Sequence, residues 1–363
     1  MIVFLLAPCY LDARTKNPPP VTIAKEEVRR ILCIKPRGIG DIVLSTIILD
    51  NLAAAFPLAT IDFLTAKFAM DAVRDHPLVG EVIGMERGVF STARVLRKRK
   101  YDLVIDLWTN PRSAQITLLS GARYRVGYGY RGRRYAYNIL ATADRGVGHS
   151  AEHNLELLKV MDVPVISRRI HFSTRPEEEE AARQWLAGNF GSRQVVGIVP
   201  SGGWPSKRAP VATWVAICKA IEREYDIGFV VLWGPGDEAD ADGIKAGLGH
   251  HVAIAPPTTV RAMAGFLKCC ALVIANDSGP MHIAAALGVP TVGLFGPTDP
   301  LSHGPFGPNG GYVIKSDLHC IVCNKLQCPY AHECLVQISL DAVVAEARKL
   351  AGPRLRASRR SEH

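Results

Sequence analysis

The sequence lacks any hydrophobic run long enough to cross a membrane. A transmembrane helix needs about 20 consecutive apolar residues, and the longest candidate, residues 284–295, is interrupted by Gly288 and Pro290. An extreme charge content is also absent, because 48% of the 363 residues are hydrophobic and only 21% are charged. This balance excludes an intrinsically disordered chain and predicts a globular protein of about two domains.

The N-terminus has no basic residue ahead of its apolar start, which disfavours a secretory signal peptide. Pro8 directly before Cys9 also disfavours a lipoprotein cleavage site, and residues 17–20 read Asn-Pro-Pro-Pro, as in a linker. We therefore expect residues 1–28 to be a loose extension.

The nine cysteines do not form the even set of a secreted disulfide framework. Cys33, Cys218, Cys269 and Cys270 lie in apolar or helical segments, where reduced thiols behave as core residues. This use of cysteine indicates a reducing compartment, the cytoplasm.

The remaining cysteines include a cluster with the spacing C-x2-C-x4-C-x5-C, formed by Cys320, Cys323, Cys328 and Cys334. The spacing matches neither a common zinc finger nor an iron–sulfur signature. Four thiolates can still enclose a tetrahedral structural zinc ion, which is one expectation. Free thiols or disulfides are the alternative, and a catalytic metal is not expected because four thiolates leave no open position.

The net charge of +9 favours acidic partners such as nucleic acid, anionic lipid or phosphorylated sugars, although it also simply promotes solubility. Basic residues gather at 94–100, at 123–134 and in a basic tail that we place at 351–363. No nucleic-acid-binding motif is present, so nucleic acid is not an expected partner.

Short apolar runs alternate with amphipathic stretches in both halves of the chain. Buried strands are predicted at 31–34, 60–64, 103–107, 195–199, 229–232, 272–275 and 291–295, and helices over 41–55, over 211–224 and from about 281. This rhythm predicts an α/β fold of two facing Rossmann-like domains with parallel sheets, over 29–175 and 176–350, with an acidic helix starting at Pro176 between them. Ligands of such sheets bind at the carboxyl ends of the strands, here in an interdomain cleft.

The segment Asn276 to His282 follows a predicted strand and opens an Ala-rich helix. Free amides at the start of a helix form a site for a pyrophosphate, and we expect the amides of Gly279 to His282 to do so. The alternative is structural: Asp277 and Ser278 would be helix caps and His282 a buried helical residue.

The segment Lys35 to Val43 also follows a strand and opens a helix. Gly38 and Gly40 permit a tight turn, but Val43 stands where a dinucleotide fingerprint has its third glycine. Asp41 at the helix start is a candidate general base, with an N-cap as the alternative.

Two further strand ends carry candidate donor-binding residues. Gly202 and Gly203 leave backbone amides accessible, and Lys207 and Arg208 offer cations for phosphate, unless this is only a solvated loop. After the next strand, Asp237 or Glu238 is placed to hold ribose hydroxyls, or to complement a helix dipole.

These motifs together make the sequence similar to glycosyltransferase family 9, the ADP-heptose:lipopolysaccharide heptosyltransferases. The resemblance is carried by residues 34–44, 204–208, 276–282 and 294–300, and spans about 30–350. It implies a GT-B fold and inverting transfer of a sugar, by default heptose, from an ADP-activated donor to a lipopolysaccharide inner core or related glycolipid.

The resemblance also implies roles for single residues. Asp41 and Lys207 would be catalytic, and Arg37, Gly38 and Gly40 would lie with Asp41 on the acceptor side. The donor side would comprise Gly202, Gly203, Lys207, Arg208, Glu238, Asp277, Ser278, Gly279, Pro280, Met281 and His282. Gly202 and Gly203 depart from members with threonines there, and Ala209 from members with an aromatic residue.

No cofactor is expected for catalysis, since cations and helix amides replace a metal ion in this family. The expected location is the cytoplasm, or the inner face of the cytoplasmic membrane, where the basic segment containing Arg123, Arg125, Arg131, Arg133 and Arg134 would contact anionic lipid. A nucleotide-sugar epimerase of similar architecture and a non-catalytic nucleotide-sugar or glycan binder remain alternatives.

Overall fold

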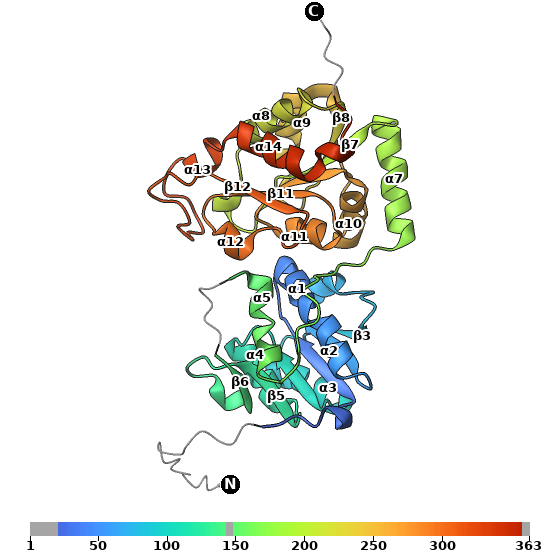
Figure 1. Cartoon of the computed structure of the whole chain (residues 1–363), viewed down its shortest axis with the longest axis vertical. Coiled ribbons are helices and arrows are strands. Elements are labelled where there is room, and N and C mark those ends of the chain that lie inside the picture. Colours follow the sequence, from blue (N-terminus) through green and yellow to red (C-terminus); the bar gives the residue numbers. More distant parts are fainter. Residues whose placement is uncertain (1–20, 143–147, 358–363) are drawn as a thin grey trace, which may run out of the picture.

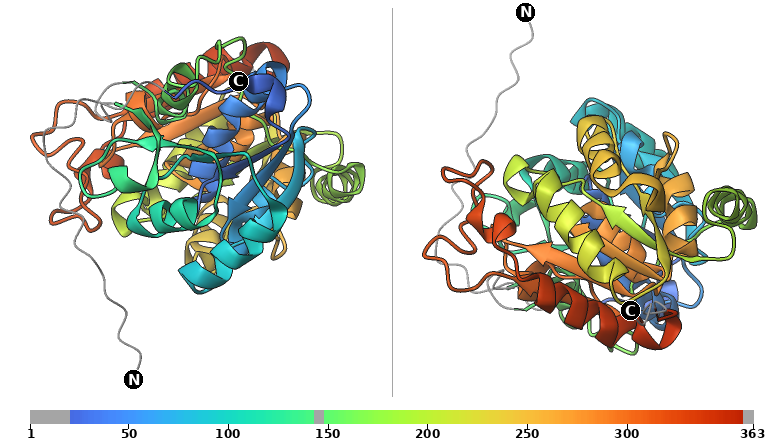
Figure 2. Two further views of the ribbon diagram at one scale, coloured as in Figure 1. Left: turned by 90° about the horizontal axis from the view of Figure 1, so that it is seen from below. Right: turned by 90° about the horizontal axis from the view of Figure 1, so that it is seen from above.

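The apolar runs predicted as buried strands form two parallel sheets in the computed structural model, which describes residues 21–142 and 148–357 (Figure 1). The predicted α/β fold of two Rossmann-like units is therefore confirmed. Figure 2 shows helices covering both sides of the sheets, so that each sheet is buried in the way that all-parallel sheets require.

The first sheet has six strands in the order β3-β2-β1-β4-β5-β6. The strands are β1 (Arg30–Ile34), β2 (Thr60–Thr65), β3 (Val79–Gly84), β4 (Leu103–Asp106), β5 (Tyr124–Tyr128) and β6 (Ile139–Ala141). The helices of this domain are α1 (Ile39–Ser45), α2 (Leu49–Ala55), α3 (Val89–Arg99), α4 (Pro111–Leu119), α5 (Ser150–His153) and α6 (Glu156–Lys159). One core cluster packs α3 and α4 on one face, and a second packs α1, α2, α5 and α6 on the other.

The second sheet has six strands in the order β12-β11-β10-β7-β8-β9. The strands are β7 (Gln194–Val199), β8 (Ile227–Val231), β9 (Val252–Ile254), β10 (Leu272–Asn276), β11 (Thr291–Phe295) and β12 (Gly310–Ile314). The helices are α7 (Pro176–Phe190), α8 (Val211–Glu222), α9 (Glu238–Leu248), α10 (Val260–Cys269), α11 (Gly279–Ala286), α12 (Pro300–His303), α13 (Glu333–Val336) and α14 (Leu340–Ala351). Helices α8, α9 and α14 cover one face, and α7, α10 and α11 belong to a cluster that continues into the first domain.

Helix α7 connects the two domains and lies at the edge of the molecule (Figure 2). Buried Arg261 of α10 pairs with Glu178 of α7 at 2.7 Å and reaches Asp75 of the first domain at 3.1 Å. Arg175, just before α7, binds the same Asp75 at 2.7 Å. These ion pairs link α7 and the residue before it to both domains.

Three local predictions need correction. The helix expected over 41–55 is interrupted by a 3₁₀ turn at Thr46–Ile48, which separates α1 from α2. The extension predicted as loose over 1–28 is described only from residue 21, and there Ile23 and Val28 are buried against the first domain. In the predicted tail, Leu355 is buried too, and the residues after 357 lie outside the described part.

Across the described ranges, 21–142 and 148–357, we find no helix with the length and hydropathy that a membrane crossing demands.

The core of the second domain depends on Trp214 of α8, which is among its largest fully buried side chains. We expect Trp214→Ala to destabilise this domain by about 3–5 kcal/mol, because a large cavity replaces buried apolar surface. Chemical denaturation followed by circular dichroism measures the change. Leu301→Ala, at an exposed position of the same domain, should change stability by less than about 0.5 kcal/mol; equal effects of the two substitutions would contradict the assigned core.

Candidate active site between the two domains

Asp41 lies in the first turn of α1 with its carboxylate accessible. Gly38 is the N-cap, so the alternative that Asp41 caps the helix is wrong. The φ of Gly38 is +87°, and a Cβ there would come within 2.3 Å of Oδ2 of Asp41, so this turn requires glycine. The Asp41 side chain is 46% exposed, and the neighbouring Arg37 is exposed as well.

Lys35, at the end of β1, supplies a buried positive charge beside Asp41. Its Nζ lies 3.9 Å from Oδ1 of Asp41, 4.8 Å from the centre of the Trp108 ring, and donates to the carbonyl of Leu107 at 3.4 Å. The sequence motif contained this lysine, but we gave it no role. Its position directly after a buried strand indicates that the ammonium group is buried too. A buried ammonium group requires specific partners, and this makes such a lysine a candidate site residue.

Lys207 follows β7 and is held by an acid from the Asn276–His282 segment. Its Nζ lies 2.6 Å from Oδ2 of Asp277 and 4.4 Å from the centre of the Trp204 ring. Thr298 donates to the same Asp277 oxygen at 2.6 Å. Asp277 therefore positions the lysine and does not cap α11, which corrects one of the structural alternatives. Thr298 is a positioning residue that the sequence motif contained without an assigned role.

Asn276, fully buried at the end of β10, joins the loop after β7 to the segment Asn276–His282. Its side chain donates to the carbonyl of Pro200 at 2.6 Å and accepts from the amide of Ala209 at 3.3 Å. The loop between these residues carries Gly202, which packs against Arg208, and Gly203, which is exposed. The accessible backbone predicted here is therefore present at Gly203.

Helix α11 begins at Gly279 with Ser278 as N-cap, but the Ser278 hydroxyl makes no capping hydrogen bond. Pro280 has no amide proton and so cannot belong to the predicted row of donors. Met281 is fully buried, and its side chain packs against β11, which leaves only its backbone for a ligand.

Ser278 and His282 each carry a buried polar atom without a partner. Among the described residues, neither the Ser278 hydroxyl nor Nδ1 of His282 has a hydrogen-bond partner. Burial lowers the pKa of His282 to about 4, against the opposing effects of Asp277 and Asp41. The imidazole is therefore neutral at physiological pH, and the unused polar atoms at the start of α11 are groups that a bound ligand would satisfy.

The two domains meet through α1 and α11, and glycine makes this approach possible. A Cβ on Gly40 would lie 2.5 Å from the His282 ring and 3.3 Å from Cα of Gly279. A Cβ on Gly279 would in turn lie 3.3 Å from Cβ of Ile39. Asp41 on one domain and the start of α11 on the other therefore face the same space.

Asp237 and Glu238 have different surroundings. Asp237 is buried and accepts from the Ser201 hydroxyl at 2.5 Å, while its other oxygen pairs with Arg208 at 2.7 Å. Arg208 thus ties its loop to the start of α9, and its guanidinium is engaged within the protein. Glu238 is exposed and accepts from the amide of Gly236 at 2.8 Å, so it is the one of the two acids that is accessible from solvent.

The four clustered cysteines line one pocket of about 200 Å³ beside the donor-side loop. Burial, and then the three other thiols of the cluster, raise the pKa of Cys334 to about 11. Nonetheless, within residues 21–142 and 148–357, no three His, Cys, Asp or Glu side chains are grouped so that they could hold a metal ion. The thiols share a pocket without forming a ready-made tetrahedral site.

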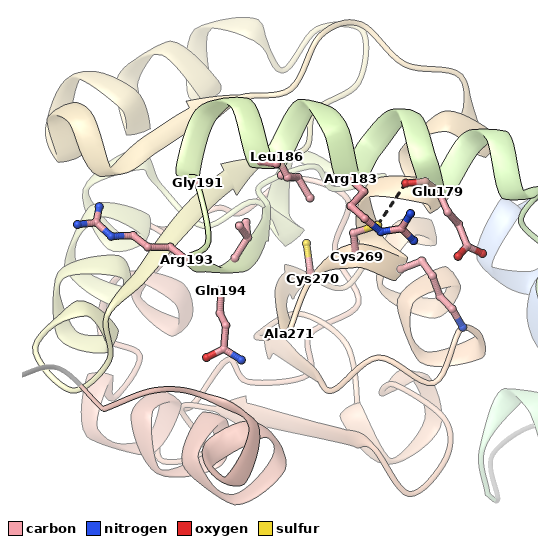
Figure 3. Close-up of a pocket in the computed structure, with 12 residues that line it drawn as sticks. Glu179, Arg183, Leu186, Gly191, Arg193, Gln194, Cys269, Cys270 and Ala271 are labelled. Atoms are coloured by element: carbon pink, nitrogen blue, oxygen red, sulfur yellow. Dashed lines mark hydrogen bonds between the residues drawn. The ribbon is translucent and has the colours of Figure 1, made fainter.

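A larger pocket of about 420 Å³ lies beneath α7, which lines it from Glu179 to Ala187 (Figure 3). Gln194 at the start of β7 and Ala271 just before β10 line it, so it opens at the amino ends of the strands. Ligands of parallel α/β sheets bind at the opposite, carboxyl ends. Cys269 in this pocket donates to the carbonyl of Glu179 at 3.6 Å, and the pocket is not part of the candidate site.

Comparisons with known proteins agree on one family. A sequence profile of glycosyltransferase family 9 (heptosyltransferase) matches residues 89–333. Lipooligosaccharide heptosyltransferase 2 of Haemophilus ducreyi is 26% identical over 350 residues, which covers 88% of this chain and 99% of that protein.

Solved structures show the same fold. A family 9 glycosyl transferase from Veillonella parvula has a TM-score of 0.79 at 22% identity, covering 90% of this chain and 98% of that one. The Escherichia coli ADP-heptose lipopolysaccharide heptosyltransferase II has a TM-score of 0.74 at 22% identity, with 89% and 99% covered.

The contact between α1 and α11 generates a prediction for Gly40→Ala. The added methyl group would overlap the His282 ring, so we expect the domains to separate and the protein to lose about 1–3 kcal/mol of stability. Small-angle scattering would report a larger radius of gyration, and thermal denaturation a lower Tm. Gly188→Ala in α7, where a Cβ meets nothing within 4 Å, should leave the radius unchanged. An unaltered radius and Tm in Gly40→Ala would refute the role of this contact.

Proposed function

Because the chain belongs to glycosyltransferase family 9, we propose that it moves a heptose from an ADP-activated donor to a lipopolysaccharide inner core or a related glycolipid, with inversion at the anomeric carbon. The observation that supports this proposal is that Asp41 of the first domain and the start of α11 in the second domain face each other at the domain boundary. An accessible carboxylate, Asp41, lies across from the start of α11, where Ser278 and His282 hold buried polar atoms without partners.

In this proposal Asp41 is the general base. The acceptor hydroxyl is a poor nucleophile, and removal of its proton as the new bond forms makes attack on the anomeric carbon easier. Asp41 belongs to one domain and the donor cradle to the other. A hydroxyl activated by Asp41 would therefore approach the sugar from the side opposite the leaving diphosphate, as inversion requires.

The leaving nucleoside diphosphate would be stabilised by Lys207 and the start of α11. Negative charge grows on the diphosphate as the glycosidic bond breaks, and preorganised donors stabilise that charge in the transition state. Asp277 and Trp204 hold Lys207, so its ammonium group needs little reorganisation. The helix amides and the Ser278 hydroxyl add donors at the same place.

Glu238 would hold the ribose hydroxyls, since Asp237 is engaged by Ser201 and Arg208. We further propose that the reaction needs no divalent cation, because Lys207 and the helix amides carry out the electrostatic work that a metal ion performs in other glycosyltransferases. The proposed location is the cytoplasm or the inner face of the cytoplasmic membrane, in keeping with the many free cysteines.

We expect Asp41→Asn to lower kcat by about 10²–10⁴-fold with little change in KM for the donor, because only the proton transfer is lost. Lys207→Met should lower kcat/KM for the donor by about 10²–10³-fold. Mass spectrometry of transfer from ADP-heptose to a truncated lipopolysaccharide acceptor measures both. The same assay with and without added Mg²⁺ tests whether the reaction depends on a divalent cation.

The controls are Asp242→Asn and Lys245→Met, which change the same residue types at exposed positions of α9. Full activity in Asp41→Asn would overturn the assignment of the base. Donor incubated alone distinguishes the alternatives: an epimerised sugar would support an epimerase, whereas a panel of nucleotide sugars that binds without any turnover would support a non-catalytic binder.

We also propose that Cys320, Cys323, Cys328 and Cys334 bind a structural zinc ion that draws their loop together. The proposal is supported by the four thiols, which line one pocket. They are not grouped closely enough to form a metal site by themselves, and a zinc ion would bring them together. The loop is bonded to the donor side through Ser206, whose hydroxyl donates to the carbonyl of Lys325 at 2.6 Å.

Metal analysis of purified protein should therefore find one equivalent of zinc. The double variant Cys323→Ser, Cys328→Ser should lose the metal and melt at lower temperature, because the loop would no longer be held closed. Cys269→Ser, outside the cluster, should keep its zinc. Zinc far below one equivalent in the wild-type protein, with no change of Tm in the double variant, would contradict the site.

A further inference from the structure

Helix α3 presents an exposed aromatic ring and a row of cations to solvent. Phe90 is 79% exposed, and Arg94, Arg97 and Lys98 lie one and two turns further along the same side of the helix. With Leu119 of α4 they surround a surface depression of about 360 Å³. We call the surface formed by Phe90, Arg94, Arg97, Lys98 and Leu119 the α3 face.

The cations of the α3 face are not used by the fold. Within the described residues, no ion pair forms on Arg94, Arg97 or Lys98, whereas Arg99 on the other side of the helix pairs with Glu81 at 2.5 Å. Phe90 thus lies exposed beside three cations that pair with no acid of the described chain. The apolar side of α3 packs on its own domain through Ala93 and Leu96, and its exposed side combines an aromatic ring with cations. An aromatic side chain that enters the acyl region and cations that contact lipid phosphates are the groups that bind proteins to anionic membrane surfaces.

The basic segment singled out in the sequence, around Arg123 to Arg134, is less available. Arg123 pairs with Glu27 at 2.8 Å, and Arg125 donates to the carbonyls of Ala122 and Ala136. Arg133 donates to the carbonyl of Thr109 at 3.2 Å. These three side chains stabilise local structure, whereas Arg131 and Arg134 of the same segment are exposed, and Arg134 adjoins the exposed Tyr135. The α3 face differs in that its three cations and Phe90 lie along one side of a single helix.

The position of α3 adds a functional reason. The helix begins after the carboxyl end of β3, and α1 begins after the carboxyl end of the parallel β1, so Phe90 and Asp41 leave the same edge of the sheet. Phe68, which follows β2, is 67% exposed at this edge as well. From Phe90 the α3 face runs away from this edge, because Arg97 and Lys98 lie near the C-terminus of α3 and Leu119 is the last residue of α4. A membrane bound to the α3 face would therefore extend along the side of the first domain and approach the edge that carries Asp41 at the Phe90 end.

We propose that the α3 face docks the first domain on an anionic phospholipid bilayer, with Phe90 inserted at the interface and Arg94, Arg97 and Lys98 on the headgroup phosphates. The proposal rests on the proposed function in one respect: a glycolipid acceptor is embedded in a membrane, so docking of the first domain on that membrane brings the acceptor to the domain that carries Asp41. Lipid binding itself does not depend on the sugar that is transferred.

The test is sedimentation of the full-length protein with vesicles of phosphatidylglycerol and phosphatidylcholine. Wild-type protein should bind anionic vesicles and lose binding as salt rises, because the contact is largely electrostatic. The double variant Arg94→Glu, Arg97→Glu and the single variant Phe90→Ser should each weaken binding at least tenfold. Circular dichroism checks that the variants remain folded.

The matched control is Arg131→Glu with Arg134→Glu, which alters the net charge equally on another exposed part of the same domain. This control should keep nearly wild-type vesicle binding. Equal loss of vesicle binding in both double variants would show that net charge alone matters. Equal retention of vesicle binding in both would show that the α3 face does not contact the membrane. Either result overturns the proposal. So would a wild-type protein that ignores anionic vesicles, or one that prefers RNA to them.

Transfer to a water-soluble, deacylated acceptor separates this inference from the proposed function. The α3 variants should retain wild-type kcat/KM on that acceptor while losing activity on acceptor embedded in anionic vesicles. Lost activity on the soluble acceptor as well would assign the α3 face to acceptor recognition and refute bilayer docking. Absence of transfer by the wild-type protein, with vesicle binding intact, would refute only the proposed function.

Discussion

The close approach of α1 and α11 is the contact on which the rest of the site depends. Gly40 and Gly279 carry no side chains, so two helix starts from separate domains come into van der Waals contact with His282 between them. An apolar cluster continues through this contact from one domain into the other. Without it, Asp41 and the start of α11 would belong to independent units, and neither could act on what the other binds.

Much of this arrangement could be predicted from the sequence, because the relevant signals are local. Buried apolar runs located the central strands, and a glycine-containing turn after a strand located each half of the site. Five strands were not predicted: the four edge strands β3, β6, β9 and β12, and β5 next to an edge. Polar or glycine residues interrupt the apolar runs of β3, Val79–Gly84, and of β5, Tyr124–Tyr128. The break between α1 and α2 was also missed, because helical periodicity continues through the 3₁₀ turn at Thr46–Ile48.

The roles of the polar residues were harder to predict, because they depend on partners far away in sequence. Asp277 has the position and type of a helix cap, yet Thr298 and Lys207 occupy its carboxylate. Asp237 and Glu238 are neighbours, but only the first is buried against Ser201 and Arg208. Sequence patterns place such residues at a strand end, while tertiary contacts decide which of them stay accessible to a ligand.

The order of the strands also bears on how the chain folds as it is synthesised. All pairings between the named strands are parallel, so each needs a distant segment, and Leu272 of β10 pairs with Val196 of β7. The outer face of the second sheet is covered by α14, the last long helix, whereas the first domain ends before α7. All elements of the first domain therefore precede α7 in the chain, whereas one apolar face of the second sheet stays uncovered until α14 has been synthesised.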